Sequence, residues 1–161
     1  MLSTTGKKTL KIVLGLLVAG VLLLNILTYA VSVVRYYGDG MEPTLQNGQI
    51  LVIVKTKDVS AGDIIAFYYN NKILVRRVIC EGGKTIALDQ SGAVTVSGKA
   101  LDEPYVSIPS VGQCNITFPY SVPRDHVFVM GDNRTVAMDS RLEAIGAIPE
   151  DRIIGKVVFA W

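Results

Sequence analysis

The chain begins with a long apolar run, residues 12–34, that carries no charged side chain. As an α-helix this run would rise roughly 34 Å at about 1.5 Å per residue, which exceeds a hydrocarbon core of about 30 Å. The run therefore predicts one transmembrane helix. A cleaved signal peptide is the alternative, with Ala30-Val31-Ser32 as a small-residue cleavage site. The run is longer than the roughly 7–15 apolar residues typical of a signal peptide, which favours a retained anchor.

Beyond the apolar run, short β-branched segments alternate with turns rich in Gly, Asn and Asp. This pattern predicts strands, at residues 49–55, 63–69, 72–80, 85–88, 93–96, 126–130 and 153–159. Asn70-Asn71 predicts a hairpin turn between the second and third strands. Prolines make residues 101–123 irregular or edge structure, and residues 140–145 are the one candidate helix of this part. The predicted class is mostly β, a barrel or sandwich of coiled sheets.

Charge orients the chain across the membrane. Lys7, Lys8 and Lys11 precede the apolar run and Arg35 follows it. Because positive residues stay on the cytoplasmic side, the N-terminus is predicted inside and the β domain outside. The expected organisation is a cytoplasmic tail at 1–11, a transmembrane anchor at 12–34 and an extracytoplasmic domain at 35–161. The predicted location is the cell membrane, in a single pass.

Composition excludes several classes of partner. Four of the 16 basic residues flank the anchor, which leaves twelve against 14 acidic residues in the domain. Without a basic patch, nucleic acid is not an expected partner. Cys80 and Cys114 form no CxxC motif and His126 is the single histidine, so neither a metal nor another cofactor is expected. A disulfide and two free thiols both remain open, and His126 is interpreted as a surface or core residue.

Several motifs of the domain resemble those of the bacterial type I signal peptidases, membrane-anchored serine endopeptidases that process the signal peptides of exported proteins. They are Met41-Glu42-Pro43-Thr44-Leu45, Gly62-Asp63-Ile64, Arg77-Val78-Ile79, Gly131-Asp132-Asn133-Arg134, Asp139-Ser140-Arg141, Gly146 and Ile154-Gly155-Lys156-Val157. Their order and the preceding anchor agree with the family, so the resemblance covers nearly the whole chain. It implies coiled antiparallel β-sheets of the signal peptidase I type behind one N-terminal transmembrane helix.

The same resemblance places the family's catalytic positions on residues that cannot perform its chemistry. The family uses a Ser–Lys dyad and a second serine that orients the lysine, and these positions correspond to Gly40, Arg76 and Ala137. Gly40 offers no hydroxyl, Arg76 stays protonated and Ala137 donates no side-chain hydrogen bond. The resemblance therefore predicts a member without an intact dyad. Asp39 is expected to form an ion pair with Arg76 in the former active site.

Peptide binding is the activity that this reading leaves intact. In the family the substrate lies extended and adds as a strand, which implies binding residues at Gly38, Asp39, Met41, Ile73 and Val75. The predicted function is to bind exported or pilin-type chains at the outer membrane boundary and to assist their assembly, with a sortase as a candidate neighbour. Members without the dyad occur in Gram-positive pilus systems. An active signal peptidase and a purely structural membrane protein are the alternatives.

Overall fold

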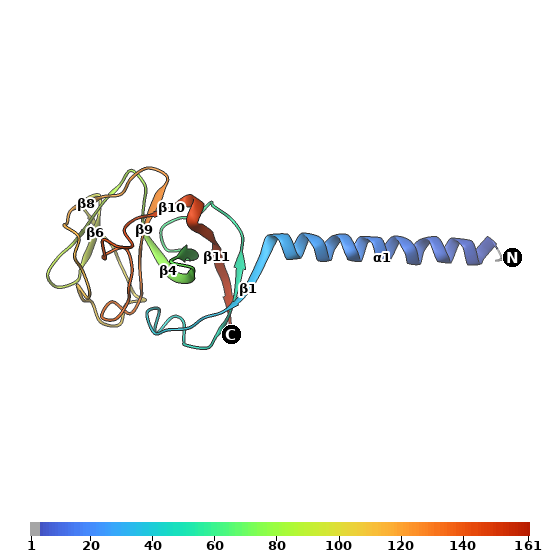
Figure 1. The fold of residues 1–161 in the computed structure, drawn as a ribbon, viewed down its shortest axis with the longest axis horizontal. Coiled ribbons are helices and arrows are strands. Elements are labelled where there is room, and N and C mark those ends of the chain that lie inside the picture. Colours follow the sequence, from blue (N-terminus) through green and yellow to red (C-terminus); the bar gives the residue numbers. More distant parts are fainter. Residues whose placement is uncertain (1–3) are drawn as a thin grey trace. The chain divides into compact units, whose positions relative to one another are not determined.

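The structure, a computed structural model, describes the backbone of residues 4–161 and the side chains of residues 11–25 and 28–161. The chain divides at Ser32 into a helical unit and a β domain, Val33–Trp161. Figure 1 draws both units, and each is described by itself. Residues 1–3 of the predicted tail lie outside the described residues.

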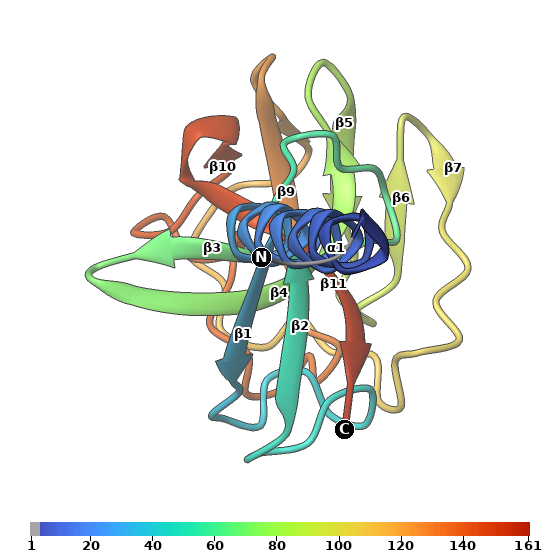
Figure 2. The same cartoon turned by 90° about the vertical axis from the view of Figure 1, so that its right-hand side faces the viewer.

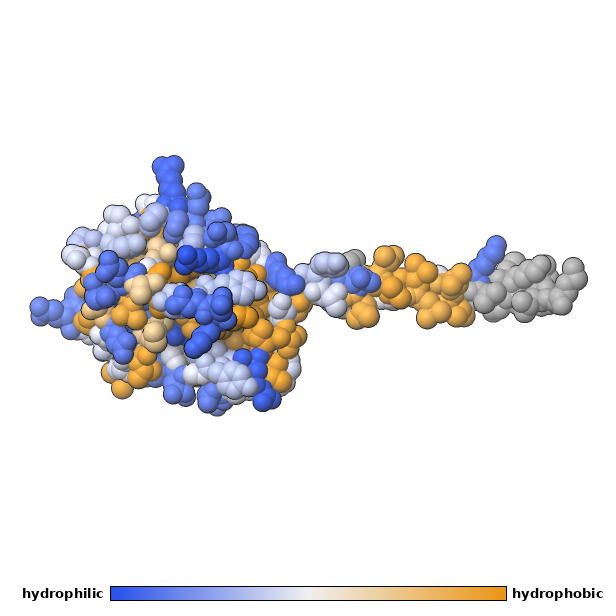
Figure 3. Space-filling view, in the orientation of Figure 1, coloured by the Kyte–Doolittle hydropathy of each residue, from blue (hydrophilic) through white to orange (hydrophobic). Residues whose placement is uncertain are grey.

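The helical unit is a single apolar helix, α1 (Thr4–Ala30). Its segment Lys11–Ala30 has a mean hydropathy of 2.4 and is long and apolar enough to cross a membrane. Figure 3 shows the hydrophobic colouring along the helix. One N-terminal apolar helix is therefore confirmed, but its predicted end at residue 34 is wrong. Residues Val31–Arg35 form strand β1 instead, because three β-branched valines around one serine favour an extended backbone beside β2.

The β domain is built from two sheets (Figure 2). The larger sheet has seven strands, in spatial order β1 (Val31–Arg35), β2 (Ile50–Val54), β11 (Ile153–Ala160), β3 (Ile64–Tyr69), β4 (Lys72–Glu81), β9 (His126–Met130) and β10 (Ile148–Pro149). The smaller sheet has four, in the order β7 (Lys99–Ala100), β6 (Val94–Val96), β5 (Thr85–Leu88) and β8 (Tyr120–Ser121). The mostly β, antiparallel prediction is confirmed.

All seven predicted strands are present. Their side chains are buried either alternately or in a continuous run, in keeping with the order of apolar and polar residues in each strand. In β2, for example, Leu51 and Ile53 are buried while Val54 is exposed. The buried side chains form three clusters, one of which brings Tyr36, Met41 and Leu45 against β2. The predicted helix at residues 140–145 is wrong. Short turns occupy this segment, and the helical element nearby is the 3₁₀-helix η1 (Glu150–Arg152).

Strand β4 is paired differently along its two halves. Its register with β3 covers Lys72 to Arg77, whereas β9 pairs only from Arg77 to Glu81. Among the described strands, none covers the second edge of residues 72–76. A strand with one open edge is a template for an additional strand, so this half of β4 is the part of the fold that matters for binding.

Candidate functional site: a peptide-sized cleft over a buried arginine

A cleft of about 530 Å³ lies beside the open edge of β4. One wall is the loop that follows β1, and the other is the hairpin of β3 and β4, with the loop around Val136 and Met138 at one end. The lining residues are Tyr36, Tyr37, Gly38, Asp39, Gly40, Tyr69, Asn70, Lys72, Ile73, Leu74, Val75, Arg76, Val136 and Met138. This space is in the range of clefts that hold ligands.

The loop wall is fixed by hydrogen bonds to its backbone. The backbone N–H of Asn133 donates to the Gly40 carbonyl at 3.1 Å, and its side-chain amide donates to the Asp39 carbonyl at 3.2 Å. The N–H of Gly38 donates to the Asn47 side chain at 3.2 Å. Gly38 has φ +117°, a conformation that favours glycine. The Gly131-Asp132-Asn133-Arg134 motif thus fixes the loop of Asp39 and Gly40 through Asn133.

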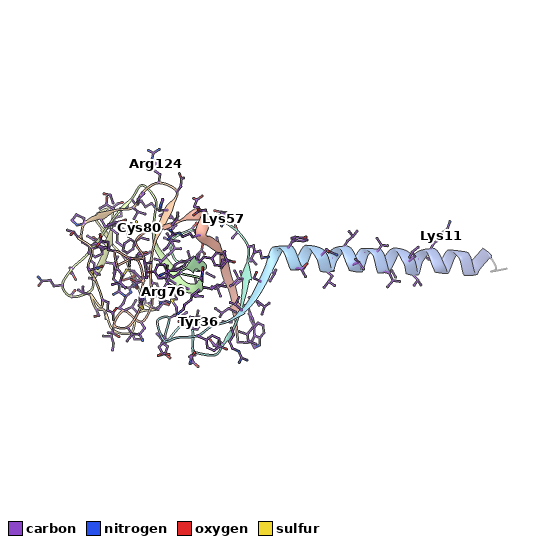
Figure 4. The ribbon with its side chains drawn as sticks, in the orientation of Figure 1. Lys11, Tyr36, Lys57, Arg76, Cys80 and Arg124 are labelled. Atoms are coloured by element: carbon purple, nitrogen blue, oxygen red, sulfur yellow. The ribbon has the colours of Figure 1, made fainter. Side chains whose placement is uncertain are left out.

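Arg76 lies at the floor of the cleft, with only 7% of its surface exposed. Its Nε donates to the Met138 carbonyl at 2.9 Å and one Nη donates to the Val75 carbonyl at 2.6 Å. The Tyr36 hydroxyl is a further polar group that interacts electrostatically with the guanidinium. Figure 4 shows Arg76 inside the β domain near Tyr36, whereas Arg124 points outward. The contacts of Arg76 are therefore neutral oxygens.

The predicted ion pair between Asp39 and Arg76 is wrong. Among residues with described side chains, no carboxylate pairs with Arg76, and Asp39 is exposed on the cleft wall. The hydrogen bonds to the carbonyls of Met138 and Val75 hold the guanidinium in another position. Burial lowers the pKa of Arg76, and the charge of Asp139 opposes this shift. Asp139 itself is bound by Arg141 at 2.8 Å.

The three positions Gly40, Arg76 and Ala137 come together, as the resemblance implies. A Cβ added to Gly40 would lie 3.1 Å from the Arg76 Cζ, so the guanidinium occupies the space that a side chain at residue 40 needs. Gly131 lies between Gly40 and Ala137. A Cβ at residue 131 would be 2.3 Å from the Ala137 Cβ and 2.3 Å from the Gly40 carbonyl oxygen. Glycine at residue 131 is what allows this approach.

The remaining predicted binding residues divide into those on the cleft and one in the core. Ile73 and Val75 line the cleft, Ile73 with 42% of its surface exposed and Val75 buried. Met41 was expected on the contact surface, but it is fully buried and packs with Tyr36 and Leu45. Its neighbours in the sequence lie on the cleft wall while its own side chain turns into the core, so it cannot contact a peptide.

Sequence reasoning missed Tyr36 and Met138 as parts of the site. Tyr36 follows the anchor and its sequence position suggests an interfacial aromatic residue, yet it is buried, lines the cleft, and its hydroxyl accepts from the Met41 N–H at 3.1 Å. Met138 and Val136 are half exposed at the cleft. In the sequence, Val136 and Met138 lie between the Gly131-Asp132-Asn133-Arg134 and Asp139-Ser140-Arg141 motifs. That position did not distinguish them from ordinary turn residues.

The other charged residues around the site are structural. Arg77 bonds Asp132 through Nε at 2.9 Å and lies 4.0 Å over the ring of Tyr105. Arg141 and Asp139 form a fully buried pair. These ion pairs fix the loops that carry the motifs, and none of them supplies a nucleophile.

Other reactive side chains lie outside the cleft. Cys80 and Cys114 are both free, which decides the alternative that the sequence left open. Burial raises the pKa of the Cys80 thiol. His126 is partly buried at the start of β9, and its Nδ1 is 2.9 Å from the Arg124 carbonyl oxygen. None of the three lines the cleft.

Comparison with known proteins assigns the chain to a family. The model of the family "Signal peptidase, peptidase S26" matches residues 9–161. The chain is 31% identical to Signal peptidase IB of Staphylococcus aureus over 96% of this chain and 90% of that protein. It is 34% identical to Signal peptidase I T of Bacillus subtilis (strain 168) over 77% and 70% of the two chains.

A solved structure agrees with this assignment. The fold is similar to the crystal structure of a signal peptidase I from Enterococcus faecalis V583, with a TM-score of 0.53 and 25% identity. The similarity covers 63% of this chain and 97% of that one. On the sequence motifs, the fold and these relatives together, the chain belongs to the signal peptidase family S26.

Proposed function

We propose that this protein binds extended segments of exported or pilin-type chains in its cleft, at the outer membrane boundary, without hydrolysing them. The observation that carries the proposal is the Arg76 guanidinium, which fills the space beside Gly40 while the edge of β4 stays open. The chemistry of peptide cleavage is absent at these positions, and the means of binding a peptide are present.

The argument against hydrolysis rests on the groups at the cleft floor. A covalent mechanism needs a nucleophile and a base within hydrogen-bond reach of it. Gly40 has no side-chain atom, and an arginine remains protonated at physiological pH even when burial lowers its pKa. Ser140 is fully buried, and its hydroxyl accepts from the Val129 N–H at 3.0 Å, so it does not face a substrate.

The argument for binding rests on the two walls. A peptide laid along the open edge of β4 would gain backbone hydrogen bonds, with pockets for alternate side chains between β4 and the loop of Gly38 to Gly40. An open cleft also disfavours the purely structural alternative, which predicts a groove closed by side chains. Assistance to pilin assembly, beside a sortase, follows from the family resemblance and is the most specific form of this proposal.

Location is the third part of the proposal. The apolar helix supports an anchored protein, and the lysines before it support a cytoplasmic N-terminus. Three neighbouring strands of the domain, β1, β2 and β11, carry exposed apolar side chains, at Val33, Val54, Val158 and Phe159, with Trp161 following β11. Figure 3 shows apolar surface over β1 and β11. Such a patch suits contact with a lipid surface.

An active signal peptidase is the second candidate, favoured by the names of its relatives. It requires a nucleophile other than residue 40. Asp39 is the first to test, because it lies on the cleft wall and is exposed. A carboxylate is a weak nucleophile toward an amide, which places this candidate second.

The test compares the full-length protein in detergent with a triple variant, Gly40→Ser, Arg76→Lys and Ala137→Ser, on a fluorogenic signal-peptide substrate. The expected result is no cleavage by the native protein and measurable cleavage by the triple variant. Gly40→Ser alone is the matched control and should stay inactive, because Arg76 occupies the space of the new side chain. Cleavage by the native protein would overturn the proposal, and Asp39→Asn would then identify or exclude the substitute nucleophile.

The partner class is tested separately, by fluorescence anisotropy with a purified pilin-type precursor and an unrelated secreted precursor. Binding of either supports a chain-binding role, and preference for the pilin-type chain supports assembly. An Ile73→Asp variant, which places a charge on the exposed cleft residue, should weaken binding of both.

A further inference from the structure

Among the described residues, the buried positive charge at the floor of the cleft forms no direct ion pair. Arg134, Arg77 and Arg141 are each matched by a carboxylate, with Glu103, Asp132 and Asp139 respectively. Arg76 is buried to a similar degree, but among the described groups its side chain hydrogen-bonds only the backbone carbonyls of Met138 and Val75. Burying a cation without a counter-ion is costly, so an anionic ligand that reaches Arg76 would be strongly favoured.

We propose that Arg76 is a carboxylate-binding site, and that the cleft takes extended apolar segments that end in a free α-carboxylate at Arg76. This inference rests on the proposed peptide-binding function and names the ligand class of the same cleft. A charge-assisted, two-pronged bond between guanidinium and carboxylate is the interaction that arginine forms best.

Strand pairing explains why the ligand should end at this point. The open edge of β4 runs from Lys72 to Arg76, and at Arg77 the edge is taken by Met130 of β9. A segment added to the open edge therefore has no further edge to pair with beyond Arg76. If it runs parallel to β4, its C-terminus lies at the guanidinium. The opposite direction would bring an ammonium group to a buried cation, so charge selects the parallel direction.

The position of the guanidinium favours a terminal carboxylate over an acidic side chain. Its hydrogen bonds go to the main-chain oxygens of Val75 and Met138, and it faces the space where a Cβ of Gly40 would stand. Because these neighbours are main-chain atoms, we infer that the guanidinium lies at the level of the main chain. Side chains of an added strand project above and below that level, whereas the terminal carboxylate continues the main chain toward Arg76.

The absence of a side chain at residue 40 belongs to the same site. A Cβ at Gly40 would approach the Arg76 Cζ to 3.1 Å and an Nη to the same distance, on the side where the loop wall meets the cleft floor. Glycine here keeps the guanidinium accessible from the cleft. Asp39 and Lys72 also line the cleft, but both are exposed and opposite in charge, so they largely cancel.

The free α-carboxylate of the ligand must exist before the ligand binds. A free α-carboxylate in an exported chain is either its natural C-terminus or the product of a peptide bond cut by another peptidase. A signal peptide released by cleavage after its small-residue motif would carry such an end. The cleft would then receive the product of a cleavage that this protein does not perform.

The experiment measures binding of short, N-terminally labelled apolar peptides to the full-length protein in nanodiscs by fluorescence anisotropy. One sequence is made with a C-terminal acid, with a C-terminal amide, and as an amide with Glu near its end. A second acid ends in bulky rather than small residues, which separates a signal-peptide remnant from an ordinary C-terminus. The acid is expected to bind roughly tenfold or more tightly than its amide, the ratio that a net gain of about 1.4 kcal/mol produces.

The variants assign the effect to Arg76. Arg76→Gln should abolish the preference for the acid, and Arg76→Lys, which keeps the charge, should retain part of it. Arg124→Gln removes an exposed arginine outside the cleft and should leave the ratio unchanged. Thermal unfolding of each variant shows whether it is folded. Should Arg76→Gln fail to fold, the acid-to-amide ratio of the native protein and of Arg76→Lys still decides the matter.

The outcomes separate this inference from the proposed function. If acid and amide bind equally to the native protein, the carboxylate site is wrong while peptide binding stands. If the Glu-containing amide matches the acid, an acidic side chain is the ligand and the terminal assignment is wrong. If no peptide binds, the proposed function fails as well. Preference for the acid in the native protein, lost in Arg76→Gln, supports the inference.

Discussion

At the scale of single residues, the domain contains two kinds of buried charge. Arg141 and Asp139 satisfy each other completely, and Arg134 bonds Glu103 at 3.0 Å and 2.6 Å. Arg76 has no such partner among the described residues and lies at a cleft instead. The first kind holds loops together, whereas the second is available to a ligand.

Removing one member of a buried pair should be severe. Asp139→Asn leaves the Arg141 guanidinium without its charge partner and is expected to lower the free energy of unfolding by about 3–5 kcal/mol. Lys84→Gln, which breaks an exposed pair with Glu81, should change it by less than about 0.5 kcal/mol. Urea unfolding of the full chain in detergent measures both. Similar values for the two variants would contradict a structural role for the buried pair.

Gly40 and Arg76 should be energetically coupled. Gly40→Ala is expected to destabilise the native protein by about 1–2 kcal/mol, because the new Cβ crowds a guanidinium held by two carbonyls. In the Arg76→Gln background the shorter side chain leaves room, so the cost should fall by about 1 kcal/mol. Combined with Arg124→Gln as the matched control, Gly40→Ala should be additive. Additivity with Arg76→Gln as well would disprove the contact.

At the scale of elements, β4 joins the core and the cleft. Val78 is hydrogen-bonded to the turn before β3 on one side and pairs with β9 on the other, Cys80 also pairs with β9, and both are buried. Residues 72–76 have β3 on one side and the cleft on the other. One strand thus has a protected half that supports the fold and an open half that can accept a ligand.

Hydrogen exchange should report these two halves. In the free protein, backbone amides of residues 72–76 that face the open edge are expected to exchange much faster than those of Val78 and Cys80. An acid peptide should slow the edge amides selectively, because it pairs with them. Residue-resolved mass spectrometry of the full chain measures both effects. Equal protection along β4 before the ligand is added would show that the edge is already covered.

At the scale of the whole molecule, an apolar helix is joined in sequence to a β domain whose first strand lies at the end of the large sheet. The exposed apolar side chains of β1, β2 and β11 follow that junction along the sheet. Phe159 and Trp161 stack with their ring centres 5.4 Å apart. Aromatic residues of this kind are frequent at membrane–water boundaries.

Trp161 is the single tryptophan of the chain and therefore a site-specific probe. In nanodiscs with brominated lipids, its fluorescence is expected to be quenched, since more than half of its surface is exposed on the apolar strands. Phe159→Ser, which removes its stacking partner, should reduce the quenching. Unquenched Trp161 would place this surface away from the bilayer.

The sequence by itself determined the apolar helix, the seven principal strands and the family, because hydrophobic periodicity and motif order are properties of short segments. It also placed Gly40, Arg76 and Ala137 in one site. Predictions from the sequence failed where the conformation of a segment depended on pairing with another part of the chain. Val31 to Val34 is apolar enough for a helix, but pairing beside β2 made it a strand.

Only the tertiary structure decided the direction of individual side chains. Met41 lies in a motif beside the cleft but turns into the core, and Asp39 is next to Gly40 but does not reach Arg76. The sequence shows which charges exist, whereas the distances between segments far apart in the chain decide which charges meet. Among the described residues no carboxylate pairs with Arg76, because the carbonyls of Val75 and Met138 hold its guanidinium.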